Sequence, residues 1–183
     1  MSRKIAKSLT KIVLVMGLVS SLTVASLAAS GDSQKPLTEQ VRHQLVMLPY
    51  YGVFDNLAYK VDGSTVTLYG QVVRPTTKDD AERSVLRIPG VDHVVNDIEV
   101  LPLSPMDDQT RVALYRRIFS TGGLYRYSMG ANPSIHIIVD NGHVTLEGIV
   151  ANEMDKNLAG IAANGVFGVF SVQNNLRVEK KRS

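Results

Sequence analysis

The sequence predicts an α+β protein built of two tandem modules, each with the element order αββαβ. Two observations predict this architecture. A phrase of twelve residues occurs twice, at 61–72 and 139–150, with seven identical positions at a fixed offset of 78. The same offset aligns 90–100 with 168–178. A register kept without a gap over roughly forty residues indicates two copies of one module.

Each copy of the phrase predicts a β-hairpin. Residues 62–64 (Asp-Gly-Ser) and 140–142 (Asp-Asn-Gly) favour a turn, because Gly and Asn tolerate positive φ. After the first turn, apolar and small residues alternate with polar ones, which predicts a half-buried strand. Its apolar face consists of Val66, Leu68, Gly70 and Val72. Asp62 and Asp140 recur in both copies, and we interpret them as turn formers rather than as catalytic acids.

Caps, prolines and periodicity predict the elements of the first module. Thr38 is the expected N-cap of the first helix, and Pro49 ends it. Thr76 or Thr77, with an acid three residues further on, resembles the capping box of a second helix. Buried positions are expected at Val41, Leu45, Leu48, Ala81, Val85 and Ile88. The expected elements are a helix at 38–48, strands at 57–61 and 66–72, a helix from about 76 to 88, and a strand at 91–100.

The second module repeats this order with one difference. Asp107 or Asp108 is the expected cap of its first helix, whose apolar side is expected to be buried. That side consists of Leu114, Tyr115, Ile118 and Phe119. The remaining elements are strands at 135–139 and 143–151, a helix opened by 152–155 and ending near Gly165, and a strand at 169–178. The connection at 120–134 is about eight residues longer than in the first copy, and function usually diverges in such loops.

The N-terminal residues predict a secretory signal peptide. Four basic residues precede an apolar run from Ile12 to about Leu27, and small residues suit cleavage after Ala28 or Ser30. An uncleaved membrane anchor is the alternative, which interspersed Ser and Thr residues disfavour. The predicted organisation is a signal peptide at 1–28, a flexible lead-in at 29–36, a first module at 37–103, a linker at 104–106, a second module at 107–179 and a basic tail at 180–183.

Charge and cysteine content exclude several classes of protein. The full chain carries a net charge of +3, but the predicted leader holds four of its 20 basic and none of its 17 acidic residues. The remainder therefore has 16 basic and 17 acidic residues, which removes the main support for a nucleic-acid partner. The chain contains no cysteine, which excludes a disulfide framework and a lipidated N-terminal Cys. We expect a soluble protein of a bacterial periplasm.

The two repeated motifs resemble the BON family, named for bacterial OsmY and nodulation proteins. The resemblance lies in Val-Thr-Leu-x-Gly-x-Val at 66–72 and 144–150, and in Gly-Val-x-x-Val-x-Asn-x-Ile/Leu-x-Val at 90–100 and 168–178. It is strongest with the double-module periplasmic members. It implies that each module is a small three-stranded mixed sheet with two helices packed on one face. It also implies a phospholipid-interacting, non-enzymatic envelope role, without the lipidation of the relatives that carry a lipobox Cys.

Several recurring residues have a structural interpretation. Gly70 and Gly148 lie inside strands, where we expect close packing by a helix backbone. Asn96 and Asn174 lie on the apolar face of the last strand, where a buried amide is expected to bind a neighbouring loop or bulge. The four histidines show no metal-binding spacing, although His136 and His143 flank one hairpin. No metal and no cofactor are predicted.

The stretch 111–127 is the most distinctive, because four arginines alternate with aromatic residues. Arginine attracts anionic head groups, and tyrosine and leucine suit the boundary with the apolar region. In lipid-binding double-module relatives, the resemblance implies that the corresponding helix and loop carry the contact. The alternative is that the apolar residues are core and the arginines a solvated face, and a protein partner is a third interpretation. The candidate lipid-binding residues are Arg116, Arg117, Leu124, Tyr125, Arg126 and Tyr127.

The leading hypothesis is a non-enzymatic periplasmic protein that binds anionic phospholipid surfaces peripherally through its second module. It would support envelope integrity or stress tolerance, including osmotic stress. The alternative is a periplasmic chaperone-like or protein-interaction module without direct lipid binding. In that case the apolar loop 50–54, the face between the modules, or an exposed strand edge would bind polypeptide.

Overall fold

The computed structural model describes residues 35–130 and 132–180. Both modules belong to one compact unit. The predicted signal peptide, most of the predicted lead-in and residues 181–183 lie outside the described residues.

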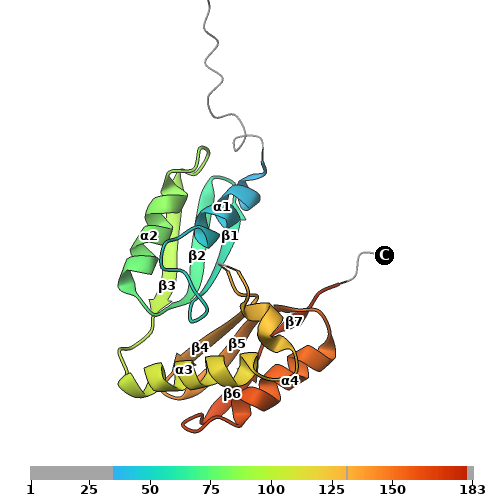
Figure 1. The fold of residues 1–183 in the computed structure, drawn as a ribbon. Helices are drawn as coiled ribbons and strands as arrows, with labels where there is room; N and C mark the ends of the chain where they lie inside the picture. Colours follow the sequence, from blue (N-terminus) through green and yellow to red (C-terminus); the bar gives the residue numbers. More distant parts are fainter. Residues whose placement is uncertain (1–34, 131, 181–183) are drawn as a thin grey trace, which may run out of the picture. The chain divides into compact units, whose positions relative to one another are not determined.

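The first module has the predicted order αββαβ (Figure 1). Its central strand β2 pairs antiparallel with β1 and parallel with β3, which makes a mixed three-stranded sheet. The hairpin expected at 61–72 is the β1–β2 unit. The elements are α1 (Leu37–Val46), β1 (Asn56–Asp62), β2 (Thr65–Val72), α2 (Pro75–Leu86) and β3 (His93–Val100).

The second module repeats this topology with an added 3-10 helix and a divided last strand. Its central strand β5 pairs antiparallel with β4 and parallel with β6 and β7. The strand expected at 169–178 begins only at Ser171 and is interrupted by residues 175–176, so the sheet has four strands. The elements are α3 (Pro105–Phe119), η1 (Leu124–Ser128), β4 (Ile135–Asp140), β5 (His143–Val150), α4 (Glu153–Asn164), β6 (Ser171–Asn174) and β7 (Arg177–Val178).

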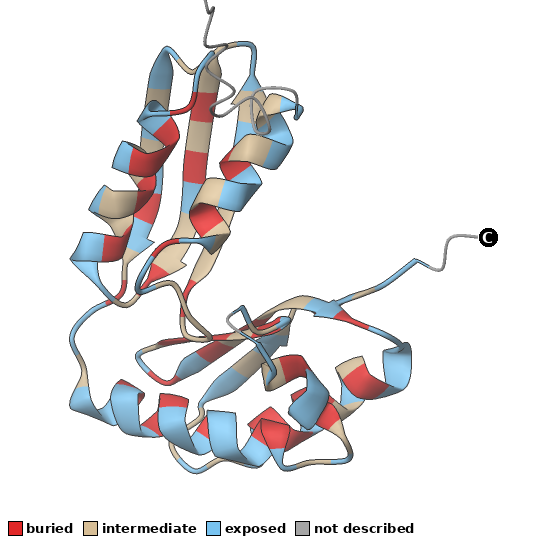
Figure 2. Ribbon diagram, turned by 45° about the horizontal axis from the view of Figure 1, so that its top comes forward, coloured by how far each residue is buried: buried red, intermediate tan, exposed pale blue. Residues whose placement is uncertain are grey.

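Each module has its own hydrophobic core, into which its two helices turn their buried sides (Figure 2). The six core residues predicted for the helices of the first module are all buried. In the second module, Leu114, Ile118 and Phe119 are buried as expected. The expectation for Tyr115 is wrong, because 37% of this residue is exposed. Its ring lies at the edge of the core, in edge contact with Phe54 and Phe119.

Proline is the first residue of α2 and α3 and immediately precedes α1. The predicted caps Thr38, Thr76 and Thr77 are wrong: α1 follows Pro36 and α2 starts at Pro75, both without a side-chain cap. Proline suits the first helical position, because its fixed φ is already helical and its missing N–H would have no partner there. In contrast, α4 begins as predicted, with the Asn152 side chain accepting the Asp155 N–H at 2.9 Å.

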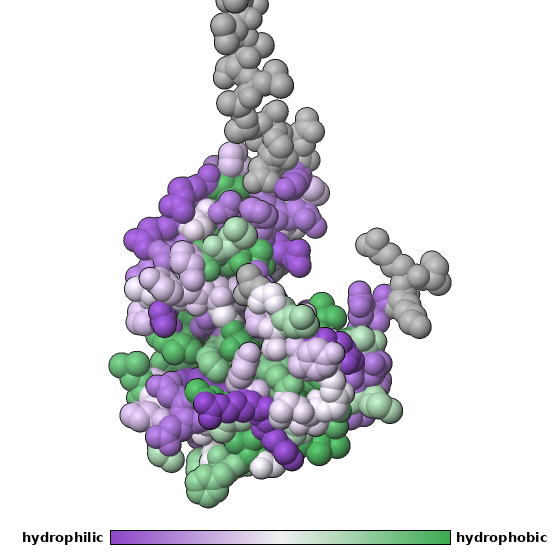
Figure 3. Space-filling view, in the orientation of Figure 1, coloured by the Kyte–Doolittle hydropathy of each residue, from purple (hydrophilic) through white to green (hydrophobic). Residues whose placement is uncertain are grey.

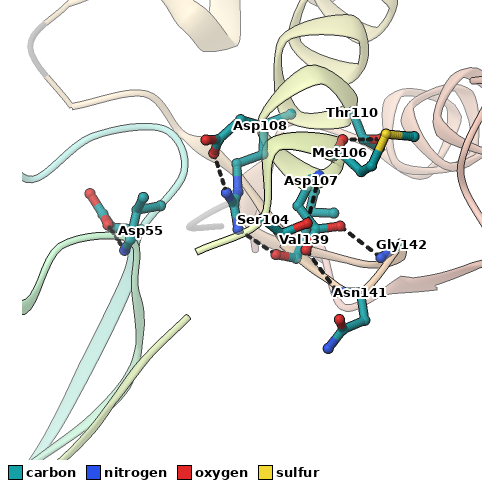
Figure 4. A network of polar contacts seen from close by, with 11 residues as sticks. Asp55, Ser104, Met106, Asp107, Asp108, Thr110, Val139, Asn141 and Gly142 are labelled. Atoms are coloured by element: carbon teal, nitrogen blue, oxygen red, sulfur yellow. Dashed lines mark hydrogen bonds and ion pairs between the residues drawn. The ribbon is translucent and has the colours of Figure 1, made fainter. Parts of the chain in front are cut away.

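The predicted cap of α3 is also wrong, and the correction shows what Asp107 does. Ser104 is the N-cap and accepts the Asp107 N–H at 3.2 Å, so α3 includes residues that we assigned to the linker. The Asp107 carboxylate is buried and accepts the N–H groups of Asn141 and Gly142, each at 2.9 Å (Figure 4). Asp107 therefore connects α3 to the β4–β5 turn.

Gly70 and Gly148 are required where predicted, but for a different reason. Their φ angles are +119° and +124°, in a region that side chains rarely adopt. A Cβ at either position would collide with a backbone oxygen of the chain entering the adjacent strand, at Asn56 or Ser134. The expectation of a helix backbone is wrong, and the close approach comes from the neighbouring strand.

Asn96 and Asn174 make the same contacts in the two modules. The Asn96 amide donates to the carbonyl oxygen of Lys78 at 3.2 Å, and the Asn174 amide to that of Lys156 at 2.8 Å. Each side-chain oxygen also accepts a backbone N–H two residues further on, at 3.3 Å. Both amides bind the first turns of α2 and α4 rather than the loop or bulge that we expected.

Candidate functional site

The last turn of α3 presents two adjacent arginines, Arg116 and Arg117, and both are exposed. Their position suits the C-terminal end of a helix, where the helix dipole favours positive charge. Within the part of the chain that the structure describes, neither forms an ion pair. Their charges are available to a ligand.

The chain then turns sharply into η1. Gly122 and Gly123 both have positive φ, which other residues rarely adopt. This turn places Leu124 fully inside the core of the second module and leaves Tyr125 62% exposed. Of these two predicted lipid-binding residues, only Tyr125 lies at the surface.

Tyr127 is also buried, at the centre of a polar cluster that holds η1 against α4. Its hydroxyl donates to the Asp155 carboxylate at 2.6 Å and accepts the Ala151 N–H at 2.8 Å. Arg126 and Asn152 donate to the same carboxylate oxygen. The hydrogen bond from Tyr127, together with Arg126, lowers the pKa of Asp155 below its usual value. The candidate loop is thus fixed to the module by a buried anion.

Arg126 is only partly available. Its guanidinium donates to the carbonyl oxygen of Gly123 at 2.8 Å, forms an ion pair with Asp155 and lies over the Tyr127 ring. The hydrogen bonds to Tyr127 and Asp155 raise its pKa. Since Asp155 offsets this charge, Arg126 contributes less positive potential than Arg116 or Arg117.

Arg111, the fourth arginine of the basic stretch, is a structural residue. Only 3% of it is exposed. Its guanidinium donates to the carbonyl oxygen of Val139 and to the Asp108 carboxylate, each at 2.6 Å. Arg111 was not among the candidate lipid-binding residues, and its helical position relative to Leu114 and Ile118 indicates the buried side.

The predicted polypeptide-binding loop at 50–54 contacts the second module. Its Val53 carbonyl accepts the Ile137 N–H at 2.7 Å, and Val53 and Phe54 pack against the second core. The Gly52 carbonyl lies 3.2 Å from Nδ1 of His136, whose ring stacks on Tyr51. Burial lowers the pKa of His136. These contacts make much of the loop a structural link between the modules.

The histidines are separated rather than clustered. His136 pairs with Glu147 across the β4–β5 ladder, whereas His143 pairs with Asp140 at the turn. His143 lies 2.8 Å from the Ser171 hydroxyl. Residues 35–130 and 132–180 contain no group of three or more His, Cys, Asp or Glu residues arranged to hold a metal ion.

The model of the BON domain matches two ranges of the sequence, 33–102 and 123–180. The chain belongs to the BON domain family. BON domains are in general non-catalytic and typical of periplasmic and envelope proteins. The two ranges coincide with most of the two modules, but α3 lies between them.

Other comparisons add little to this assignment. The C-terminal domain of CdsD, a structural protein of the type III secretion system of Chlamydia trachomatis, is 12% identical with a TM-score of 0.32 over 80% of this chain and 99% of that one. A second structure of CdsD is also 12% identical, with a TM-score of 0.31 over 79% and 94%. No curated protein sequence matches the chain. None of the helices in the described part has the length and apolar character needed to cross a membrane.

Proposed function

We propose that this BON protein is a non-enzymatic periplasmic protein that binds anionic phospholipid surfaces peripherally through its second module. In this role it supports envelope integrity or stress tolerance. Family membership supports an envelope location and a non-catalytic role. The lipid contact itself is argued from the arrangement of side chains at the end of α3.

The observation that carries the proposal is the pair Arg116 and Arg117 at the end of α3, which is exposed and has no ion-pair partner among the described residues. The exposed ring of Tyr125 follows in η1. A basic residue near an anionic membrane contributes about 1 kcal/mol of binding energy, which salt screens. A tyrosine ring suits the interface between head groups and acyl chains. Together these groups support weak, salt-dependent binding at the membrane surface.

Two other candidate residues, Leu124 and Tyr127, are buried and hold η1 in position. Leu124 anchors η1 in the core, and Tyr127 binds it to Asp155. We therefore propose that these two side chains orient Tyr125 and Arg126 rather than touch lipid directly.

The polypeptide-binding alternative is weaker at the loop where we expected it. Val53 and Phe54 are packed against the second module, and the Val53 carbonyl already accepts the Ile137 N–H. The exposed residue of the loop, Tyr50, lies under the guanidinium of Arg74 at 4.9 Å. Little of this loop is left for a polypeptide partner.

Vesicle co-sedimentation of residues 31–183 tests the proposal. We expect binding to vesicles containing phosphatidylglycerol at low salt and little binding to neutral vesicles. Replacing two arginines that contribute about 1 kcal/mol each, in Arg116→Gln/Arg117→Gln, is expected to lower the affinity roughly thirtyfold.

The control Arg42→Gln/Arg87→Gln makes the same change of charge at two exposed arginines of the first module. It is expected to lower the affinity much less. An equal loss in both variants, or no binding of the unaltered protein to anionic vesicles at low salt, would refute the proposal.

A further inference from the structure

Bulky apolar side chains are exposed along α4 and in the loop that follows it, and the arginine-based proposal gives them no role. Phe167 is 94% exposed and Phe170 is 78% exposed. Met154 and Ile161, seven residues apart on α4, are exposed as well. Such a separation places both on one side of a helix. We call these four residues the apolar ridge.

The first module has no such ridge at the equivalent positions. The offset of 78 places Thr76 at Met154, Arg83 at Ile161, Pro89 at Phe167 and Asp92 at Phe170. Two charged residues, one polar residue and one proline thus correspond to four bulky apolar residues. At this offset α2 corresponds to α4, and β3 and β6 begin at equivalent residues, so these elements form without the apolar side chains.

The ridge belongs to the same helical layer as the arginines. The loop after α4 approaches the first turns of α3, since a Cβ on Gly168 would lie 3.2 Å from the Thr110 hydroxyl. At the other end, Gly122 contacts Leu158 of α4, and Arg126 pairs with Asp155. The two helices therefore run antiparallel, as Figure 1 shows.

The surface colouring agrees with this difference between the copies. In Figure 3, the surface over α2 is mainly hydrophilic, whereas larger hydrophobic patches, crossed by a hydrophilic band, cover the second module. An exposed apolar surface of this kind commonly marks a site of protein or membrane interaction.

We propose that the apolar ridge is a second membrane contact, in which Phe167 and Phe170 insert among the acyl chains while the arginines bind the anionic head groups. This inference rests on the proposed lipid-binding function and extends it to α4. A side chain that is 94% exposed projects from the surface instead of lining a groove. A bilayer accommodates projecting side chains without a complementary shape. Arg116 and Arg117 on the adjacent helix, which have no ion-pair partner in residues 35–130 and 132–180, provide charge complementarity to an anionic membrane.

The ridge predicts a component of binding that salt does not remove. Attraction between arginine and head groups weakens as salt rises, because exposed charges are screened. Transfer of phenylalanine from water into hydrocarbon depends on apolar area. The two contributions are therefore separable by salt and by mutation.

Tryptophan fluorescence gives a direct test, because the chain contains no tryptophan. In Phe170→Trp, addition of phosphatidylglycerol vesicles is expected to shift the emission to shorter wavelength, and lipids brominated on their acyl chains are expected to quench it. The matched control is Asp92→Trp, at the equivalent exposed position of the first module. It is expected to show neither effect.

A mutational test separates this inference from the proposed function. Phe167→Ser/Phe170→Ser is expected to lower vesicle affinity at least tenfold at both low and high salt. Arg116→Gln/Arg117→Gln is expected to lower it mainly at low salt. Circular dichroism and analytical ultracentrifugation of each variant report folding and association.

If the serine variant binds vesicles normally and the arginine variant does not, the ridge is no membrane contact and the proposed function stands. If the unaltered protein binds no vesicles at low salt, the proposed function fails and the ridge proposal fails with it. If the serine substitutions dissociate a dimer but leave vesicle binding unchanged, the ridge joins two copies of the chain and the proposal is overturned.

Discussion

Removing one hydroxyl, in Tyr127→Phe, is expected to destabilise the second module and loosen η1. The Tyr127 hydroxyl donates to the Asp155 carboxylate at 2.6 Å and accepts the Ala151 N–H at 2.8 Å. A hydrogen bond to a charged group contributes about 1.5–3 kcal/mol, and loss of the acceptor of the part-buried Ala151 N–H costs about 1 kcal/mol more. Asp155 keeps Arg126 and Asn152 as partners, so we expect a total loss of about 2–4 kcal/mol.

Urea unfolding measures this loss as a lower midpoint, and amide hydrogen exchange locates it. Exchange at Ala151 is expected to accelerate more than at amides in the first module. The control Tyr125→Phe removes the same atom from a residue that is 62% exposed, and little change is expected. Equal unfolding midpoints for the two variants, or unchanged exchange at Ala151, would refute the role given to Tyr127.

Two further predictions concern the scaffold. Gly148→Ala is expected to cost about 3 kcal/mol or more, because φ is +124° and a Cβ would collide with the Ser134 oxygen; Gly165→Ala, with φ of −85°, is the control, and similar unfolding midpoints for the two would contradict the argument. Burial lowers the pKa of His136 in the folded state, so its contribution to stability is present above pH 6.5 and lost as the pH falls through the depressed folded pKa. The urea midpoint is therefore expected to decrease on acidification from pH 7 towards pH 5, with a smaller decrease in His136→Gln; identical slopes for the two proteins would exclude His136 as the cause.

The repeat and the alternation of apolar residues were sufficient to predict the element order and most helical core positions. These features depend on local patterns that recur at a fixed offset. Helix starts were less predictable, since proline and threonine at 75–77 are competing signals and only backbone geometry decides between them. The reason for Gly148 was missed because the Ser134 oxygen comes from a residue fourteen positions earlier.

The candidate site, like the fold, was predicted only in part from the sequence. Sequence analysis identified the basic and aromatic stretch and left Arg111 out of the candidates, but it did not predict the buried contacts that Arg111 makes. Tyr125 and Tyr127 are equally apolar, and they differ only because η1 turns one ring outward and the other towards Asp155. Such choices depend on contacts between segments distant in sequence. The apolar ridge was visible in the sequence once the copies were aligned, but its exposure required the structure.

One backbone amide shows how the two copies diverged while their folds remained the same. Val73 and Ala151 are equivalent at the offset of 78, and each follows the central strand of its sheet. The Val73 N–H donates to the Asp55 carboxylate at 2.8 Å, whereas the Ala151 N–H donates to the Tyr127 hydroxyl.

The second copy satisfies this amide with a residue from its longer connection, supported by Asp155, where the first copy has Thr77. This part-buried N–H has an acceptor in each copy, so both arrangements preserve the fold. The contact in the second copy, however, also holds η1 against α4 and leaves Tyr125 and Arg126 exposed in the segment that follows α3. The Tyr127 hydroxyl in the longer connection thus takes the place of the Asp55 carboxylate as the acceptor. The same contact fixes the position of the surface for which we propose membrane binding.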